Sequence, residues 1–434
     1  MRGERRINIF VGLFIIIIAV SGIVFLLFQL FDDPSADSGN KTALNTPAPT
    51  PVGEEQPQTS TPVISPTPAG EQPLTPDEEQ TPTPVPEPKE HVPVKGLYLT
   101  TNTVGTPQRL QHYVDLANKT EINAYVIDIK DDNGIICYET NVPLAVKHGV
   151  WEKKYDVKEV LRLLHDNGIR AIGRIVCFSD PEMPLKEPDL SLKNPNGTVF
   201  KVPYYNSHLA WLDPSSKEAW QYLIDIAKEA SELGFDEIQY DYVRFPETTN
   251  FKYDMSYLER EKSEYINDFM QESIDQLPGV IFSADIFGSI CLQSKDAGGI
   301  GQTLETISEI FDYISPMIYP SHFANDSTTH YSGNGVGTNI NGVLYPKPDF
   351  EPYNVIYNSL IITKSRLEKA DLDIKVRPYL QGFTANTYLE EGYYMEYGVE
   401  QYRDQIKAVY DAGYSEWLFW NSRNTYVEEA FLPE

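Results

Sequence analysis

Cysteine is scarce in this chain of 434 residues. The three cysteines, Cys137, Cys177 and Cys291, are odd in number and have no C-x-x-C spacing. This pattern excludes a disulfide framework and a cysteine-based zinc site, so buried single thiols are expected. The seven histidines are scattered, without the spacing of a metal-ligand pair. We therefore expect no metal and no cofactor.

The signatures of several enzyme classes are also missing. The chain has no G-x-S-x-G nucleophile elbow and no H-E-x-x-H zinc motif. No glycine-rich phosphate loop follows its first predicted strand. Hydrolases with a serine nucleophile, zinc peptidases and nucleotide-binding folds are therefore poor interpretations.

Basic residues are few, with 35 Lys and Arg against 63 Asp and Glu and a net charge of −28. The first six residues carry three arginines and one glutamate, and Asp32–Pro93 carries eleven acidic and two basic residues. These counts leave −21 for Lys95–Glu434. So acidic a domain should not bind nucleic acid or anionic polymers, and neutral or cationic ligands fit better.

One long apolar run is present near the start of the chain. Ile9–Phe28 contains twenty residues without a charge, enough to span a membrane as a helix. Three arginines precede it, which predicts a cytoplasmic N-terminus. A cleaved signal peptide is the alternative, but no convincing cleavage site follows. We expect residues 1–31 to form an uncleaved signal anchor of a single-pass protein of the cell membrane.

The next segment, residues 32–93, is rich in Pro, Thr, Glu, Gln and Ser. It has too few apolar residues to form a core, so disorder is expected. Its proline content predicts a stiff, extended spacer that holds residues 94–434 away from the membrane.

From Lys95 onward, strand-like and helix-like patterns alternate. Eight strands are predicted, and helices are predicted between them, among them one with Asp213 as N-cap and Pro214 at its first position. The predicted strands are Lys95–Thr100, Asn123–Lys130, Arg170–Phe178, Phe235–Pro246, Val280–Gly288, Tyr313–Pro320, Lys375–Phe383 and Glu416–Asn421. This count favours an α/β fold of the (β/α)8 TIM-barrel type over a doubly wound open sheet.

Polar residues recur at alternate positions near the ends of these strands. Because successive residues of a strand face opposite ways, they are expected to point together into one mouth of the barrel. The set includes Asp128 with Lys130, Gln239 with Asp241, Ser283 with Asp285, Met317 with Tyr319, and Arg377 with Tyr379 and Gln381. The other face is apolar or aromatic and should meet the helices.

Two carboxylates, Asp241 and Asp285, end the neighbouring fourth and fifth strands. Such a pair is the machinery of glycoside hydrolysis, in which one carboxyl donates a proton and the other attacks or activates water. Asp241 is predicted as nucleophile or base, kept ionised by Arg244 or Lys130, and Asp285 as acid. Adjacent strands at similar height imply a separation of about 5–6 Å, which favours retention of configuration.

Aromatic and polar residues in the predicted loops suit a sugar, because aromatic faces stack on sugar rings. Tyr204, Tyr205 and His208 follow the third strand. Residues predicted to bind substrate are Asp128, Lys130, Trp211, Tyr319, His322, Gln381, Trp420 and Asn421. Lys130–Gly134 is most simply a turn, and a metal site at Asp131 and Asp132 is the lesser alternative.

Four segments resemble the glycoside hydrolase family built on the DUF4015 domain, and FDEIQYDYVRFP at Phe235–Pro246 is the most specific. The others are Ile127–Gly134, Ile314–Pro320 and Arg377–Phe383. The resemblance covers about Val94–Tyr426. It implies a TIM barrel related to amylase-like glycosidases on bacterial surfaces. Amylase-type enzymes place a Glu acid at strand five, where this chain offers Asp285.

The sequence thus predicts a glycosidase that acts on an extracellular or cell-wall polysaccharide. Two alternatives from other classes remain. A glycan-binding barrel without catalysis would keep the aromatic residues and tolerate loss of Asp241. A polymer-modifying glycosyl transferase would use the same carboxylates while excluding water.

Overall fold

The computed structural model describes residues 92–202, 209–247, 252–294, 296–330 and 332–433. The predicted membrane anchor and almost all of the proline-rich spacer lie outside these residues, so both stay predictions. Within the described ranges, no helix is long and apolar enough to cross a membrane.

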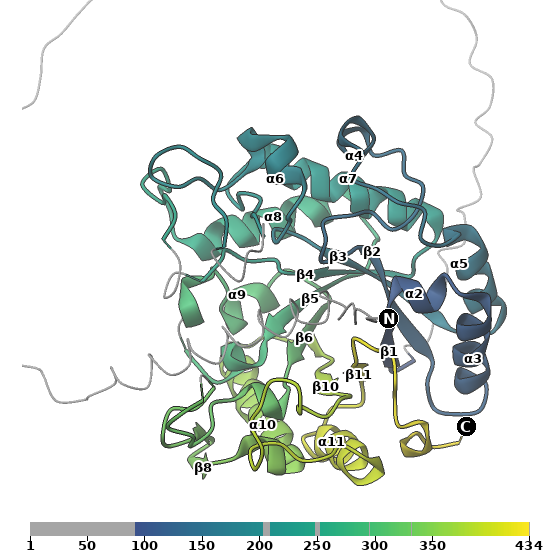
Figure 1. Cartoon of the computed structure of the whole chain (residues 1–434), viewed down its shortest axis with the longest axis vertical. Helices are drawn as coiled ribbons and strands as arrows, with labels where there is room; N and C mark the ends of the chain where they lie inside the picture. Colours follow the sequence, from purple (N-terminus) through teal and green to yellow (C-terminus); the bar gives the residue numbers. More distant parts are fainter. Residues whose placement is uncertain (1–91, 203–208, 248–251, 295, 331, 434) are drawn as a thin grey trace, which may run out of the picture. The chain divides into compact units, whose positions relative to one another are not determined.

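The described residues form a closed parallel barrel (Figure 1). The strand order is β10-β11-β1-β2-β3-β4-β5-β6-β9, and β10 also pairs with β6, which closes the ring. The barrel strands are β1 (Lys95–Leu99), β2 (Ala124–Lys130), β3 (Arg170–Val176), β4 (Glu237–Asp241), β5 (Phe282–Phe287), β6 (Tyr313–Met317), β9 (Lys375–Val376), β10 (Tyr379–Gln381) and β11 (Trp417–Trp420). The predicted (β/α)8 barrel is confirmed.

Helices alternate with the strands along the chain and surround the barrel (Figure 1). They are α2 (Thr101–Val104), α3 (Pro107–Ala117), α4 (Pro143–His148), α5 (Val157–Asp166), α6 (Met183–Lys186), α7 (Lys217–Leu233), α8 (Lys262–Gln276), α9 (Leu304–Ser308), α10 (Pro352–Lys369) and α11 (Val399–Asp411).

The start of α7 differs from the prediction. Its N-cap is Ser216, whose hydroxyl accepts a hydrogen bond from the Ala219 amide at 3.2 Å. The Asp213 carboxylate instead accepts the Ser215 amide at 2.9 Å and closes a separate turn. The chain therefore turns once more before the helix begins, and the proposed cap at Asp213 was wrong.

The seventh strand is interrupted. β9 and β10 are two short pieces, because Pro378 between them has no N–H to donate to the ladder. An antiparallel hairpin of β7 (Thr338–Ile340) and β8 (Val343–Tyr345) was not predicted, since strands so short leave little alternation to detect.

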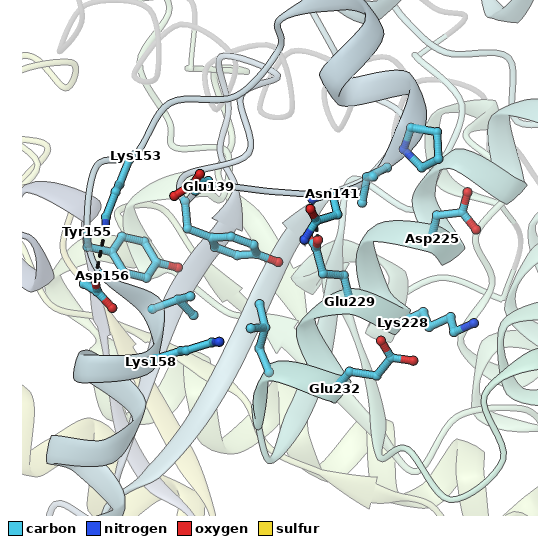
Figure 2. Close-up of a pocket in the computed structure, with 15 residues that line it drawn as sticks. Glu139, Asn141, Lys153, Tyr155, Asp156, Lys158, Asp225, Lys228, Glu229 and Glu232 are labelled. Carbon is cyan, nitrogen blue, oxygen red and sulfur yellow. Dashed lines mark hydrogen bonds and ion pairs between the residues drawn. The ribbon is translucent and has the colours of Figure 1, made fainter.

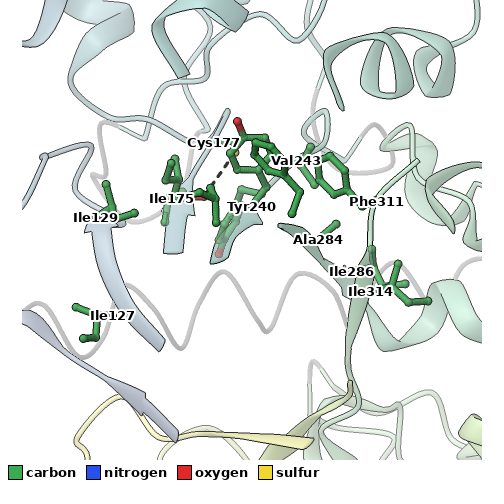
Figure 3. Close-up of a cluster of buried hydrophobic side chains, with 14 of the residues drawn as sticks. Ile127, Ile129, Ile175, Cys177, Tyr240, Val243, Ala284, Ile286, Phe311 and Ile314 are labelled. Carbon is green, nitrogen blue, oxygen red and sulfur yellow. Dashed lines mark hydrogen bonds between the residues drawn. The ribbon is translucent and has the colours of Figure 1, made fainter. Parts of the chain in front are cut away.

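Side-chain parity separates two buried clusters. The outer cluster packs between the strands and the helices and contains Ile127, Ile129, Ile238, Tyr240, Ala284 and Ile286. Figure 3 shows part of it, with side chains from β2, β3, β4, β5 and β6. The inner cluster fills the barrel and contains Tyr98, Tyr319, Tyr379 and Trp420. The residues predicted to be apolar therefore face the helices, and the residues that alternate with them along each strand face the barrel interior.

Candidate active site

Asp241 is the last residue of β4. The register places Ile175 of β3 beside Tyr240 and Val176 beside Asp241. Tyr242, the next residue, has φ 51°, in the left-handed region that a bulky side chain rarely adopts. Its amide donates a 2.7 Å hydrogen bond to Oδ1 of Asp241. Backbone strain of this kind concentrates at functional sites.

Arg174 of β3 is the cation that meets Asp241. Its Nε and Nη2 donate to Oδ2 of Asp241 at 3.0 and 2.7 Å. Nη1 donates to Oδ1 of Asp128 at 2.7 Å, and Asp132 accepts two longer bonds of 3.3 Å. The Arg174 side chain is fully buried, and its guanidinium joins three carboxylates at the mouth of the barrel. We call these four residues the mouth cluster.

Neither predicted partner holds Asp241. The β2–β3 register shifts at a bulge between Asp128 and Lys130. Lys130 then donates to the Val176 carbonyl at 2.6 Å and pairs with Asp180 at 2.9 Å, with both side chains fully buried. The expectation that Lys130 would keep Asp241 ionised was wrong, because the bulge redirects its side chain.

Arg244 lies beyond the strand, after the turn at Tyr242. Its guanidinium carbon is 4.6 to 5.1 Å from the ring centres of Phe287, Tyr242 and Trp211. The Trp211 indole donates to the Arg244 carbonyl at 3.1 Å. Arg244 thus packs in an aromatic cage, and the ion pair expected between it and Asp241 is replaced by that of Arg174.

Asp285 lies on β5, which pairs with β4 in parallel. Gln239 is opposite Ser283 and Tyr240 is opposite Ala284, so Asp241 and Asp285 are the next residues along the two strands. Asp285 is 3% exposed, and its Oδ1 has no hydrogen-bond partner among the described residues. Burial, followed by the nearby charge of Asp241, raises the pKa of Asp285 well above its usual value.

Asp128 is the most buried of the three carboxylates that Arg174 binds. The Tyr98 hydroxyl donates to its Oδ2 at 2.6 Å. Burial outweighs the Arg174 charge and raises the pKa of Asp128 to about 6. The Tyr98 ring stacks on Trp420 with centroids 3.9 Å apart, and Arg174 lies 5.2 Å from the Trp420 centroid.

Gln381 and Asn421, predicted to bind sugar hydroxyls, have protein partners. Gln381 accepts from the Ser321 hydroxyl at 2.7 Å and donates to Asp349 at 3.0 Å. Asn421 donates to the carbonyls of Gly382 and Thr425 at 2.6 and 2.8 Å. Both side chains hold the loops of the mouth in place.

His322 and Tyr319 lie in an aromatic group at the same end of the barrel. The His322 ring is 5.1 Å from that of Tyr319 and stacks on Tyr388 at 5.4 Å. Both His322 ring nitrogens are buried without a hydrogen-bond partner in the described structure. Burial lowers the pKa of His322 to about 3, so the imidazole is neutral.

A cavity of about 250 Å³ opens between the loops after β10 and β11. Phe383 and Tyr388 are half-buried on its wall, and Trp420 lines it as well. Since Trp420 also contacts Arg174, the indole is a wall shared by this cavity and the mouth cluster. Tyr204, Tyr205 and His208 lie outside the described residues.

A larger groove of about 680 Å³ lies elsewhere, between α7 and the segment that leads into α5 (Figure 2). None of the mouth cluster lines it. Its two tyrosines, Tyr138 and Tyr155, are buried and cannot stack on a sugar. Its Glu229 carboxylate is already bound by Thr140 and by the Asn141 amide at 2.5 and 2.6 Å. The groove therefore lacks the features of a glycan site.

No group of three or more potential metal ligands occurs in the described part of the chain. Asp131 closes a turn instead, accepting the Asn133 and Ile135 amides at 3.0 and 3.2 Å and pairing with Lys154 at 2.6 Å. Gly134, with φ 74°, completes that turn.

Sequence reasoning missed Arg174 and Tyr98, and it named Asp132 only as a possible metal ligand and not as a partner of Arg174. Arg174 was visible as a charged residue inside the apolar strand sequence RAIGRIV. An arginine buried in a strand requires carboxylate partners, so this signal could have been used.

A family model described as "Putative glycosyl hydrolase domain" (DUF4015) matches residues 96–426. No curated protein sequence matches this chain. A crystal structure of a hypothetical protein from Ruminiclostridium thermocellum is 53% identical, covering 44% of this chain and 96% of that one, with a TM-score of 0.41. The PgaB (BpsB) glycoside hydrolase domain from Bordetella bronchiseptica is 11% identical, covering 78% and 98%, with a TM-score of 0.54, and shares the fold.

Proposed function

Because this chain belongs to the DUF4015 family of glycosyl hydrolases, we propose that its barrel cleaves a glycosidic bond in an extracellular or cell-wall polysaccharide. The observation that carries this proposal is the contrast between two neighbouring carboxyl groups. Asp241 is bound by a guanidinium, whereas Asp285 is buried without a partner for Oδ1. One is suited to act as an anion and the other as an acid.

In the proposed mechanism, Asp241 attacks the anomeric carbon while Asp285 transfers its proton to the departing glycosidic oxygen. The Tyr242 amide and Arg174 fix both oxygens of the Asp241 carboxylate. A glycosyl ester on Asp241 results. Asp285, now ionised, takes a proton from water as the water displaces Asp241, and both carboxyls return to their starting states.

The strand register supports retention of configuration. Neighbouring parallel strands are about 4.8 Å apart, and Asp241 and Asp285 follow directly on paired residues. Retaining enzymes hold their carboxyls about 5–5.5 Å apart, closer than inverting ones. The first product released should therefore have the anomeric configuration of the substrate.

The test is a screen of the full chain on defined wall and capsular glycans, with the product anomer followed by proton NMR. Retention on a cleaved glycan would support the pair. Inversion would require a wider carboxyl separation and would remove Asp241 as the nucleophile. Binding of glycans without any product would instead favour a non-catalytic barrel.

We also propose a location on the extracytoplasmic side of a bacterial membrane, supported by Ile9–Phe28 and the spacer that follows it. The protein should fractionate with membranes at full length. An N-terminus mapped between Phe28 and Lys41 would show cleavage and contradict the anchor.

A further inference from the structure

The cavity beside Trp420 differs in charge from the rest of the domain. Residues 95–434 carry a net charge of −21, yet no Asp or Glu is among the residues that line this cavity, all of which are described. The only charged side chain on its wall is Arg423. The larger groove beside α7, by contrast, is lined by five acidic residues and three lysines, among them Glu139, Asp225 and Lys228. Local charge at this cavity is therefore opposite to the average.

Arg423 is presented by a fixed loop. The Asn421 side chain accepts the Arg423 amide at 2.8 Å and ties the loop to Gly382. Asn424, with φ 49°, accepts the Thr100 amide at 2.7 Å and donates to the Tyr98 carbonyl at 2.8 Å. The loop is thus held on both sides of Arg423.

The Arg423 guanidinium itself is uncommitted. Arg423 is exposed, and no described residue forms a hydrogen bond or an ion pair with its side chain. A guanidinium presents paired N–H donors that match a carboxylate. Arg423 can therefore bind an incoming anion without giving up a protein partner.

The remaining wall suits a sugar ring. The rings of Phe383 and Tyr388 are half-buried on the wall, and Asn386 and Thr387 offer hydrogen-bonding groups. About 250 Å³ is below the usual range of about 300–1,000 Å³ for ligand pockets, so the cavity fits one ring and not a long segment.

We propose that this cavity is a subsite for a sugar unit that carries a carboxylate, and that Arg423 is its specificity-determining residue. The inference rests on the proposed glycosidase function, because Trp420 joins the cavity to the mouth cluster. It also revises the expectation from net charge: the domain as a whole disfavours anions, while this subsite selects one anionic group.

Two kinds of sugar carboxylate are distinguished by the probes. One is oligogalacturonate, with the carboxylate on the ring, and the other is peptide-free wall glycan, with the carboxylate on a lactyl ether. Each is compared with its carboxyl-reduced form. Binding to the full chain is measured by titration of tryptophan fluorescence, and hydrolysis by release of reducing ends.

For at least one pair, the acidic form should bind about tenfold tighter than the reduced form, as expected for one charge-assisted hydrogen-bonded pair at an exposed site. Arg423→Gln should abolish this preference without weakening binding of the reduced form. Arg423→Lys should restore part of it, because the point charge remains and the paired donors do not. Arg109→Gln on α3, also an exposed arginine, is the matched control and should change nothing.

Equal binding of acidic and reduced forms in both pairs would overturn the inference. So would an Arg423→Gln variant that loses affinity equally for both forms. Hydrolysis without preference would leave the proposed function standing and remove this subsite. A binding preference for the acidic form without any hydrolysis would leave the carboxylate subsite standing and remove the proposed glycosidase function.

Discussion

The barrel contains two buried clusters of arginine and carboxylate, one at each end of its strands, and they differ in balance. At the amino ends, Arg377 forms a bidentate pair with Glu237. Arg170 lies 3.3 Å from Glu237, and Glu416 lies 3.8 Å from Arg377. Two cations thus meet two anions. At the carboxyl ends, Arg174 is the one cation among the described residues that pairs with Asp128, Asp132 and Asp241, and Asp285 lies nearby.

The excess of carboxylates has a consequence for charge state. Although burial opposes it, the charge of Arg377 lowers the pKa of Glu237. At the mouth, burial wins, and the pKa values of Asp128 and Asp285 rise. The Asp132 side chain is also 27% exposed, whereas those of Glu237 and Arg377 are fully buried. The charges of the amino-end cluster balance, and Glu237 and Arg377 are closed to solvent, which indicates a structural role. The mouth cluster has more carboxylates than cations and is partly open to solvent, which indicates a chemical role.

The largest effect should come from Asp241→Asn. The amide is nearly isosteric but cannot attack the sugar or accept a proton. We expect kcat/KM to fall by at least about 10²–10⁴-fold, the range of a single acid–base role. The loss of stability should be smaller than for Arg377→Met, because Arg174 keeps its contacts to Asp128 and Asp132. Steady-state kinetics and thermal unfolding on the same preparation check this. Wild-type turnover in the variant would remove Asp241 from the mechanism.

Arg377→Met should show the opposite pattern. It leaves the buried Glu237 carboxylate with the Ser283 hydroxyl at 2.7 Å and the longer contact to Arg170 as its cationic partner, and breaking a buried pair costs about 3–5 kcal/mol. Denaturant unfolding should show this loss, while kcat/KM per folded molecule stays unchanged. Adding Glu237→Gln should recover part of the stability. A fall in kcat/KM with stability intact would erase the distinction between the two clusters.

The smallest effect concerns pH. Glu237 has a lowered folded pKa, so its stabilisation is present above its ordinary pKa of 4.5 and is lost as pH falls. Asp128 has a folded pKa of about 6 against an ordinary 3.8, so its contribution to stability decreases as pH rises between these values. The decrease is on the order of 3 kcal/mol.

The measurement is the unfolding free energy from pH 3 to about pH 7. Relative to wild type, Asp128→Asn should lose less stability as pH rises from about 4 to 6. Glu237→Gln should lose less as pH falls below about 4.5. Parallel curves for wild type and Asp128→Asn would contradict the raised pKa of Asp128.

Alternation along the chain was enough to predict the barrel and its two faces. Strands such as Ala124–Lys130 are buried throughout, and residue parity decides which side chains face inward. It placed Asp241 and Asp285 at neighbouring strand ends, where the register has them. The hairpin of β7 and β8 was missed because three-residue strands carry almost no period.

The ionic partners could not be predicted in the same way. The parity of a residue along its strand predicts which face its side chain points to. It does not predict how far along the barrel axis the side chain lies, which depends on strand stagger and on bulges. One bulge sends Lys130 to Asp180, and one left-handed residue, Tyr242, turns the chain before Arg244. Arg174 then occupies the position expected for either of them. Gln381 and Asn421 were predicted for sugar, but their amides hold loops whose paths only the fold defines.

The pairing of β1 with β11 also imposes an order in time. Tyr98 stacks on Trp420, and its carbonyl accepts the Tyr426 hydroxyl across 328 positions of the chain. During synthesis, the ribosome makes β1 long before β11, so the nascent barrel has an open seam and an incomplete mouth. Contacts of such separation form late and slowly. The mouth is therefore complete, and activity becomes possible, only after the last barrel strand has been made.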